Sequence, residues 1–275
     1  MAEREAAVDL TPQRGPAALG PAYRYMLEHD AHAPGAVDRG LLAEMVRIGP
    51  ATVEVLYAGC PPEPVRYAPG SRPVLEGIVG EAIGAAKPPE ERTRRLAVWT
   101  ARFYRGAPAV SLDAVVLGGT EEEVIARGSD WCTDVARVAC VLAQVAGMPA
   151  RLVYLFDLDQ AYSGHAIVEV WRDGGWGAVD ACTGVVYRED GRPASTWSLM
   201  RAPDLVAAHR AACPGALYTT AAQFRAAAVA NYAIWEARQY EYPVSGLNAY
   251  YRSILSMADQ GWPGGLRWLH GEDRL

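Results

Sequence analysis

One stretch of the sequence decides the fold: Gly128-Ser129-Asp130-Trp131-Cys132-Thr133-Asp134-Val135-Ala136. Here a polar turn changes into an apolar helical pattern, and Cys132 stands at the change. The first backbone N–H groups of a helix, and the positive end of its dipole, stabilise a thiolate over a thiol. Cys132 is therefore a candidate nucleophile. We interpret Asp134 as an acidic residue that stabilises the helix start.

The helix that begins at Cys132 is predicted to have one apolar face. Apolar residues recur at spacings of three and four until Gly147-Met148-Pro149 ends the pattern: Val135, Val138, Ala139, Leu142 and Val145 or Ala146. This spacing is typical of an amphipathic helix, and the glycine and proline are typical of its end. We expect the apolar face to lie in the core.

Beyond this helix the hydrophobic period changes towards two. Residues 151–157, 165–171 and 176–181 have the composition of strands, and Asp173-Gly174-Gly175 predicts a hairpin turn between the last two. Three consecutive strands after a buried helix indicate an α+β fold. We expect the helix with the cysteine to pack on an antiparallel sheet.

Two further residues complete a candidate catalytic group. His165 opens the second strand and Asp180 lies in the third. The hairpin sets these strands side by side, and a helix packed across the same face would bring Cys132 to the imidazole. His165 would then take the thiol proton and later protonate the leaving amine. Asp180 would hold the far ring nitrogen, which fixes the tautomer and stabilises the charged ring.

Four motifs in this region resemble the core of the transglutaminase-like superfamily, a branch of the papain-like cysteine enzymes. They are Cys132-Thr133-Asp134-Val135-Ala136, Ala146-Gly147-Met148-Pro149-Ala150-Arg151, Gly164-His165-Ala166-Ile167-Val168-Glu169-Val170 and Gly175-Trp176-Gly177-Ala178-Val179-Asp180. The resemblance covers about residues 121–187. It implies a papain-like fold, a Cys132-His165-Asp180 triad and an S-acyl intermediate.

The resemblance also implies an oxyanion hole. Members of the family build it from the backbone N–H of the cysteine and one upstream donor, which together stabilise a tetrahedral intermediate. The backbone N–H of Cys132 is accordingly one expected donor. The indole N–H of Trp131 or Trp99 is a candidate for the other.

The substrate groove is expected to involve Asp130, Gly164 and Trp176. Asp130 stands where members of the family commonly have glycine, and it either caps the helix or selects a substrate with a positive group. Ile167 stands where an aromatic residue is common. Trp176 has an alternative interpretation, as a residue packed against its cross-strand neighbour.

The sequence on both sides of this core has mainly helical patterns. We expect a flexible arm at residues 1–20, a helical N-terminal layer at 21–125, the catalytic core at 126–190 and a helical C-terminal extension at 191–275. Thr120 and Glu123 predict a capping box at the start of a short helix. The other predicted helices include residues 37–46, 74–86, 88–104, 196–212, 219–240 and 246–258.

Composition restricts the partners and the compartment. The chain has 275 residues, of which 51% are hydrophobic, so it can bury a substantial core. A formal charge of -6 disfavours nucleic acid and anionic membranes as partners. Residues 1–20 lack the apolar run of a signal peptide or membrane helix, so we expect a cytoplasmic protein. A single lysine, Lys87, among many arginines suggests a high-GC bacterial source.

The remaining cysteines and histidines have less specific patterns. Five irregularly spaced cysteines without a CxxC pair favour reduced thiols over disulfides or a zinc site. Cys140 and Cys182 are interpreted as structural, and Cys182 is also a candidate neighbour of the catalytic group. His29 and His32 form a His-x-x-His pair with no third ligand nearby, and His209 and His270 have no partner at a useful spacing. We expect no metal and no cofactor.

The sequence thus predicts a cysteine enzyme that attacks an amide, ester or thioester carbonyl. The expected acyl donor is a small molecule or a peptide, free or carrier-bound, and the acceptor is an amine or water. An amide-forming acyltransferase of small-molecule biosynthesis is preferred, and a protease or amidase is the alternative. A non-catalytic binding scaffold and a metal-dependent hydrolase that uses His29 and His32 remain as rival hypotheses.

Overall fold

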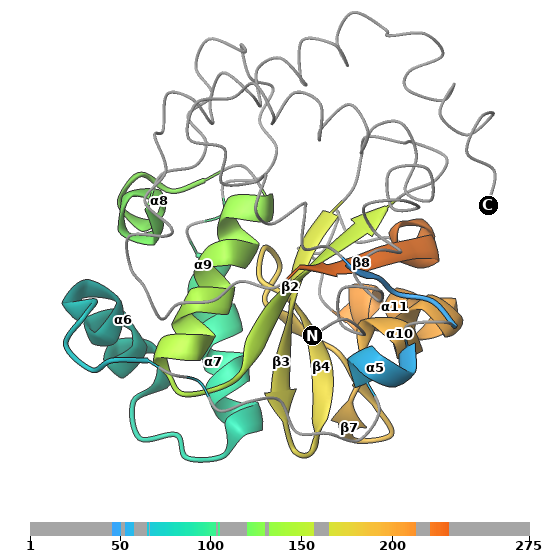
Figure 1. The fold of residues 1–275 in the computed structure, drawn as a ribbon, viewed down its shortest axis with the longest axis horizontal. Coiled ribbons are helices and arrows are strands. Elements are labelled where there is room, and N and C mark those ends of the chain that lie inside the picture. Colours follow the sequence, from blue (N-terminus) through green and yellow to red (C-terminus); the bar gives the residue numbers. More distant parts are fainter. Residues whose placement is uncertain are drawn as a thin grey trace, which may run out of the picture.

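The fold combines helices with an antiparallel sheet, as the sequence predicts (Figure 1). The computed structural model describes residues 46–50, 53–57, 65, 67–102, 104, 120–129, 132–156, 165–212 and 221–230. The predicted arm at residues 1–20 and the predicted helix at 246–258 lie outside these ranges. No helix among the described residues is long and apolar enough to cross a membrane.

A six-stranded sheet forms the centre of the described chain, in the order β1-β8-β2-β3-β4-β5. Each strand pairs antiparallel with its neighbours. Three strands follow one another along the chain as predicted, β2 (Ala150–Phe156), β3 (His165–Arg172) and β4 (Gly175–Asp180). The shorter strands are β1 (Val46–Arg47), β5 (Val185–Val186) and β8 (Ala226–Ala230).

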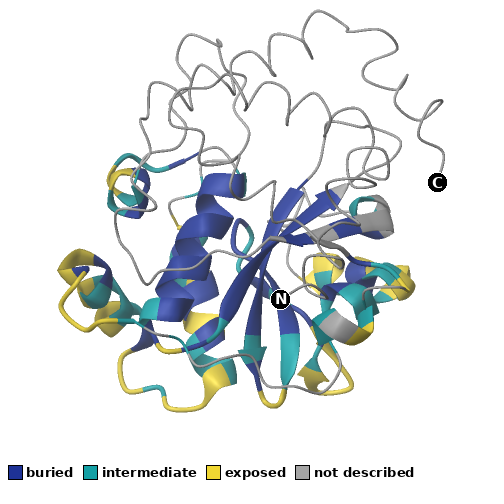
Figure 2. Cartoon of the chain, viewed as in Figure 1, coloured by how far each residue is buried: buried dark blue, intermediate teal, exposed yellow. Residues whose placement is uncertain are grey.

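One face of the sheet is covered by the helix that begins at the candidate nucleophile, α9 (Cys132–Val145). Every residue from Thr133 to Gln144 is buried, so α9 is enclosed on all sides and not along one stripe only (Figure 2). The reason is that further helices pack on its outer face. They are α6 (Pro73–Ile83), α7 (Pro89–Thr100) and α8 (Glu121–Arg127).

The predicted capping box begins α8. The Thr120 hydroxyl accepts a hydrogen bond from the Glu123 N–H at 3.2 Å, and the Glu123 carboxylate accepts one from the Thr120 N–H at 2.8 Å. Two of the N–H groups that lack a partner inside the helix are thereby satisfied. The box fixes where α8 starts, and α8 in turn leads into the loop before Cys132.

The other face of the sheet carries a second hydrophobic core. It is covered by α5 (Val53–Tyr57), α10 (Thr196–Arg201), α11 (Pro203–Ala212) and the 3-10 helix η2 (Ala221–Arg225). A small hairpin of β6 (Arg188–Glu189) and β7 (Arg192–Pro193) precedes α10. The sheet is therefore the middle layer between two layers of helices (Figure 1).

Two helix predictions are wrong at residues that the structure describes. The predicted helix at 219–240 contains β8, and the predicted helix at 37–46 ends where β1 begins. The sequence of β8 is Ala-Ala-Ala-Val-Ala, which has high helix propensity. Pairing with β1 on one side and β2 on the other overrides that propensity. The C-terminal segment therefore supplies a central strand and is not wholly helical.

Buried arginines bind the layers together. Arg172, at the end of β3, donates to the Glu90 carboxylate of α7 at 2.6 Å and to the backbone carbonyls of Gly177 at 2.6 Å and Tyr187 at 3.0 Å. Its guanidinium lies against Gly177, where an added Cβ would be 2.2 Å from Nη1. Arg172 therefore connects helix α7 with both strands of the hairpin.

A second buried ion pair lies on the opposite face. Glu169 of β3 is fully buried and accepts hydrogen bonds from Arg151 Nε at 2.8 Å, the Tyr57 hydroxyl at 2.9 Å and the Thr196 N–H at 2.7 Å. These partners come from β2, α5 and the start of α10. Glu169 thus fastens two helices to the sheet.

Candidate active site

Cys132 is the first residue of α9, as predicted. Just before it, Ser129 forms a parallel bridge with Tyr104. The carboxylate of buried Asp134 accepts a hydrogen bond from the Ser129 hydroxyl at 3.2 Å and forms an ion pair with Arg127 at 3.1 Å. Asp134 therefore ties the end of α8 and the following loop to the first turn of α9. This contact adds a positioning role to the helix-stabilising one that the sequence predicts.

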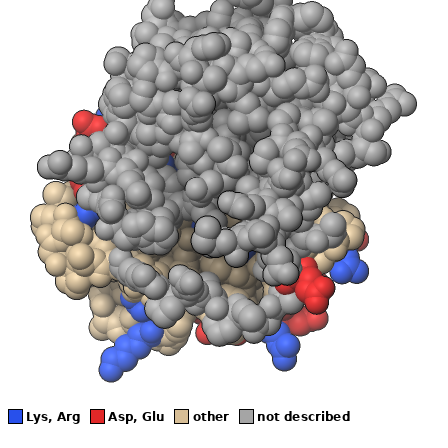
Figure 3. Space-filling view, in the orientation of Figure 1, with Lys and Arg blue, Asp and Glu red and all other residues tan. Residues whose placement is uncertain are grey.

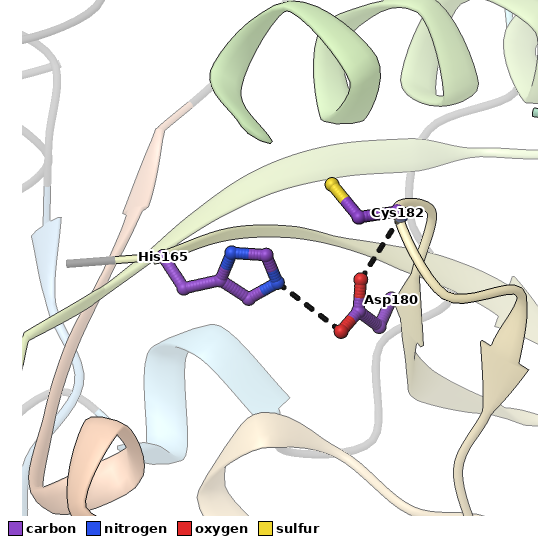
Figure 4. Close-up of side chains that lie close together, drawn as sticks. All are labelled: His165, Asp180 and Cys182. Atoms are coloured by element: carbon purple, nitrogen blue, oxygen red, sulfur yellow. Dashed lines mark hydrogen bonds and ion pairs between the residues drawn. The ribbon is translucent and has the colours of Figure 1, made fainter. Parts of the chain in front are cut away.

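His165 and Asp180 form a buried pair. His165 Nε2 lies 3.1 Å from Asp180 Oδ2, and the other carboxylate oxygen accepts a hydrogen bond from the Cys182 N–H at 3.0 Å (Figure 4). His165 is 5% exposed and Asp180 is 0% exposed, so water cannot replace either contact. The carboxylate is held from both sides, and it holds the imidazole through Nε2.

Cys132 joins this pair through its thiol. Although burial opposes it, the nearby His165 imidazole and the backbone N–H of Ala166 lower the pKa of the Cys132 thiol. Because Asp180 takes Nε2, Nδ1 is the ring nitrogen left for the thiol. Cys132, His165 and Asp180 therefore lie near one another, a grouping that could supply a nucleophile, a base and an orienting acid.

The end of the β3–β4 ladder makes room for the sulfur. Pairing between these strands runs from Val168↔Val179 to Arg172↔Gly175, so β3 continues past it to His165 while the chain turns away after Asp180. Ala166 therefore has no strand partner on the β4 side. Its backbone N–H is therefore not used in β3–β4 pairing, and it helps to lower the pKa of the Cys132 thiol. This effect has no signature in side-chain type, so the sequence did not predict it.

The meeting of helix and strands differs from the prediction in one respect. Val168 and Val179 lie in the core that contains α9, whereas Ile167 and Ala178 lie in the core on the other face. Side chains alternate along a strand, so His165 and Asp180 belong to the face opposite α9. The three residues meet at the end of the ladder, and the helix does not pack across the face of the histidine and aspartate.

Electrostatics favour a charged pair at this site. Burial opposes a thiolate at Cys132, but the hydrogen bond and charge of His165 and the Ala166 N–H outweigh it, and the pKa of the thiol is lowered. Burial likewise opposes a charged imidazole, but Asp180 and Cys132 raise the pKa of His165 to about 10. A lowered thiol pKa beside a raised imidazole pKa favours a thiolate–imidazolium pair over the neutral pair.

The other described cysteines are held as thiols. Burial, followed by the charge of Glu121, raises the pKa of Cys140. Burial, followed by the charges of Asp180 and Cys132, raises the pKa of Cys182 well above its ordinary value. The contrast with Cys132 is therefore large, since only its pKa is lowered among these described thiols. Cys60 and Cys213 lie outside the described residues.

Of Trp131 and the three predicted groove residues, the structure describes only Trp176. Asp130, Trp131 and Gly164 lie outside the described residues, so their proposed roles stay predictions. Trp176 is four residues from Asp180 along β4, which corresponds to about 13 Å. There it packs edge-on to Trp171 and beneath the Arg151 guanidinium. Trp176 is thus packed against its cross-strand neighbour near the start of β4, at the opposite end of the strand from Asp180.

Of the four histidines considered as metal ligands, the structure describes only His209. His29, His32 and His270 lie outside the described residues. His209 of α11 packs on Tyr187 and accepts a hydrogen bond from the Arg188 N–H at 3.2 Å, which is a structural contact. Among the described residues, one group of His, Cys, Asp or Glu has spacing suited to a metal ion, and it consists of His165, Asp180 and Cys182.

Part of the chain is similar to a known protein family. The family model described as the transglutaminase-like superfamily matches residues 77–181, a range that runs from within α6 to just past Asp180. The match begins earlier than the core expected at 126–190 and includes the helices that enclose α9. No curated protein and no solved structure matches the chain.

Proposed function

We propose that the transglutaminase-like domain formed by residues 77–181 makes this chain a cysteine-dependent acyl-transfer enzyme. The observation that carries the proposal is the position of His165. Its buried imidazole lies 3.1 Å from the buried Asp180 carboxylate, and it lies near enough to the half-buried Cys132 thiol to lower the pKa of that thiol. A nucleophile, a proton carrier and an orienting acid in this order suit attack on a carbonyl carbon.

In the first half-reaction the Cys132 thiolate attacks the carbonyl carbon of an amide, ester or thioester. A carbon–sulfur bond forms, and the carbonyl electron pair moves to oxygen. When the tetrahedral intermediate collapses, the bond to the leaving group breaks and His165 gives it a proton. The product is an S-acyl cysteine. Asp180 keeps the ring oriented and stabilises its charge without taking the proton.

In the second half-reaction an amine or water attacks the S-acyl carbon. His165, now neutral, takes a proton from the attacking group as the new bond forms. Collapse of the second intermediate breaks the carbon–sulfur bond and restores the thiolate. The imidazole regains the charge it had at the start, so the cycle closes without a cofactor.

Oxyanion stabilisation is assigned to the backbone at the start of α9. The N–H of the first helical residue has no acceptor within the helix, and Cys132 is that residue. Such a donor typically stabilises the intermediate by about 3 to 4 kcal/mol. The second donor is assigned to the neighbouring Trp131.

The acceptor separates two versions of this function. We prefer amide formation in small-molecule biosynthesis, with a small or peptidic acyl donor that is free or carrier-bound. Transfer to water, as in a protease or amidase, is the alternative and uses the same residues. We place the reaction in the cytoplasm, because the described cysteines are free thiols. On the face shown in Figure 3 the described surface carries both charge signs, which offers little to nucleic acid.

Thiol reactivity tests the proposal without knowledge of the substrate. The native protein is treated with a limiting amount of iodoacetamide at near-neutral pH, and each cysteine is quantified by peptide mass spectrometry. We expect Cys132 to be alkylated well before Cys140 and Cys182, because its sulfur is the one held as a thiolate. Equal labelling of Cys182 or Cys140 in the folded protein contradicts the proposal.

Activity on model substrates separates the two versions. Small thioesters and amides are supplied with and without an amine acceptor, and the products are identified by mass spectrometry. Cys132→Ala is expected to abolish turnover of any accepted substrate, while Cys140→Ala, a matched change on the same helix, retains it. Amide product supports acyl transfer to amines, and acid product alone supports hydrolysis.

A further inference from the structure

Cys182 is a buried thiol that the acyl-transfer mechanism does not use. It lies in the turn after β4, two residues beyond Asp180, and is 5% exposed. Its backbone N–H already holds the Asp180 carboxylate, a task that any residue except proline can perform. The side chain therefore adds something that this hydrogen bond does not require, which is a sulfur beside the His165–Asp180 pair.

The three side chains offer ligand atoms around one position. One ligand atom each from His165, Asp180 and Cys182 lies within 4.8 Å of the others, and all three residues are buried (Figure 4). Zinc bonds of about 2.0 to 2.3 Å in tetrahedral geometry place neighbouring ligand atoms about 3.3 to 3.8 Å apart. The imidazole and carboxylate are already 3.1 Å apart. The Cys182 sulfur lies within 4.8 Å of both other ligand atoms, so it would have to move towards them when the ion binds.

The donor set selects the ion. A thiolate, an imidazole and a carboxylate are the three side-chain ligands that zinc takes in proteins. Magnesium and calcium prefer oxygen ligands, and calcium takes six to eight of them. The contributing elements are the start of β3, the end of β4 and the turn that follows it, and all three side chains are buried. A compact site of this kind suits an ion that accepts four ligands.

We propose that His165, Asp180 and Cys182 bind one Zn²⁺ ion, and that the bound ion switches off acyl transfer. Binding of the ion does not depend on the proposed function, whereas inhibition rests on it. On binding, the Cys182 thiol and the Nε2 of the His165 imidazolium each lose a proton to solvent, and a zinc–sulfur bond forms. Zinc also bonds to His165 Nε2 and to a carboxylate oxygen of Asp180, and a water molecule fills the fourth position.

Inhibition follows from the proton balance on the imidazole. With zinc on Nε2, the ring holds a proton on Nδ1 only. To protonate a leaving group it would have to become an imidazolate, which is far less favourable than the loss of one proton from an imidazolium. Zinc also takes the carboxylate that stabilises the charged ring. His165 can then no longer serve as both base and acid.

Metal binding is tested directly on the full chain, without a substrate. Zn²⁺ is titrated against a chromophoric chelator, and Co²⁺ is used to look for tetrahedral d–d bands and a thiolate charge-transfer band. We expect one ion per chain and both cobalt features. Cys182→Ala should weaken zinc binding by at least roughly 100-fold, since an outer-shell partner alone is worth ~10- to 100-fold. It should also remove the thiolate band.

Three further variants serve as controls for the zinc titration. Cys132→Ala and Cys140→Ala keep all three ligands and should bind zinc as the native chain does, while Cys182→Ser repeats the loss of the thiol at similar volume. Near-ultraviolet circular dichroism checks that each variant is folded. Zinc binding that survives in a folded Cys182→Ala chain, or that is lost in Cys132→Ala, overturns the site.

Inhibition is measured in a separate experiment, as the effect of zinc on substrate turnover. If zinc binds as described and slows turnover of an accepted substrate in the native chain but not in Cys182→Ala, the switch is supported. If zinc binds and turnover is unchanged or faster, the inhibitory role is overturned while the acyl-transfer proposal stands. Absence of thiol-dependent turnover in zinc-free protein contradicts the proposed function and leaves the metal site to the binding experiment.

Discussion

At the scale of single residues, the chemistry depends on which neighbour controls the Cys132 proton. Burial alone raises the pKa of a thiol, as it does for Cys182. At Cys132, which is half-buried, the effect of burial is outweighed by the nearby His165 imidazole, together with the Ala166 N–H. The histidine in turn remains charged because Asp180 faces its other nitrogen. Each residue of the triad thus holds the next in its reactive charge state.

The pH dependence of alkylation tests this coupling. In the native protein the thiolate should persist below the ordinary thiol pKa of about 8.5, because the pKa of Cys132 is lowered. His165→Gln removes the hydrogen bond and the positive charge and leaves burial and the Asp180 carboxylate, which both raise the pKa. The midpoint of the iodoacetamide rate profile should therefore move to higher pH.

Cys140 provides the internal reference for that profile. Its pKa is raised by burial and by Glu121, neither of which His165→Gln changes. Any residual labelling of Cys140 should follow the same curve in both proteins. An unshifted Cys132 midpoint in the variant would mean that His165 does not control the thiol.

Asp180→Asn tests the orienting role. The change removes the charge that stabilises the imidazolium and keeps nearly the same shape, so the raised pKa of His165 should fall. Turnover should slow by no more than the ~10⁴-fold seen for the same change in a serine triad, because a cysteine thiolate forms more readily. Alkylation of Cys132 should be retained in part. Unchanged turnover and an unchanged pH profile would remove Asp180 from the mechanism.

At the scale of elements, the site depends on where two strands stop pairing. β3 extends past the last pair with β4, and the sulfur of the first residue of α9 occupies the space beside the Ala166 N–H. Histidine and aspartate reach this point from one face of the sheet and the helix from the other. The geometry therefore requires β3 and β4 to keep their register.

Gly177→Ala tests that requirement. A Cβ at this position would lie 2.2 Å from Nη1 of Arg172, and the guanidinium is held by Glu90 and by backbone carbonyls. The side chain has little freedom to move away, so overpacking should lower the free energy of unfolding by about 1 to 3 kcal/mol. Urea denaturation followed by circular dichroism measures the change.

Gly175→Ala is the matched control for that experiment. Gly175 opens the same strand, and an added Cβ meets nothing within 4 Å. Its variant should remain close to the native protein in stability. An equal decrease in unfolding free energy in the two variants would show that replacing a strand glycine is itself destabilising, whether or not the new Cβ meets Arg172.

The sequence predicted these elements well where local signals agreed with tertiary contacts. The cysteine, helix period and Gly-Pro stop predicted α9, and alternation with an Asp-Gly turn predicted the β3–β4 hairpin. β8 was missed because alanine favours a helix locally, and its strand form depends on pairing with β1 and β2. The face on which His165 meets Cys132 depends on strand ends, which sequence patterns locate poorly.

At the scale of the whole molecule, the sheet separates two hydrophobic cores, and buried ion pairs tie each layer of helices to it. Arg72 and Arg137 both pair with buried Glu121, which fastens α8 to α9 and to the segment before α6. On the other face, Arg151 and Glu169 join the sheet to α5 and α10. Arg151 is the last residue of the Gly-Met-Pro-Ala-Arg motif, so in this chain the motif supplies one partner of the buried ion pair with Glu169.

Glu169→Ala tests how strongly that pair supports the molecule. The change leaves the Arg151 guanidinium buried without its charge partner and frees the Tyr57 hydroxyl and the Thr196 N–H. Breaking a buried pair in this way typically costs about 3 to 5 kcal/mol of unfolding free energy. Thermal and urea denaturation should both show a large loss.

Glu91→Ala provides the contrast for that loss. Glu91 forms ion pairs with Arg94 and Arg95 on the outside of α7, where solvent screens them. The variant should unfold close to the native protein. A similar loss in both variants would mean that burial of the Arg151–Glu169 pair contributes little.

The central claim is that Cys132 carries the acyl group, and trapping of that intermediate tests it most directly. The native protein is mixed with p-nitrophenyl acetate at near-neutral pH, quenched in acid within the burst of product release, and analysed by intact mass and peptide mapping. We expect a single acetyl group on Cys132 and none in a folded Cys132→Ala variant. Acetylation of Cys182 or Cys140 in place of Cys132, or a burst that persists in Cys132→Ala, would contradict it.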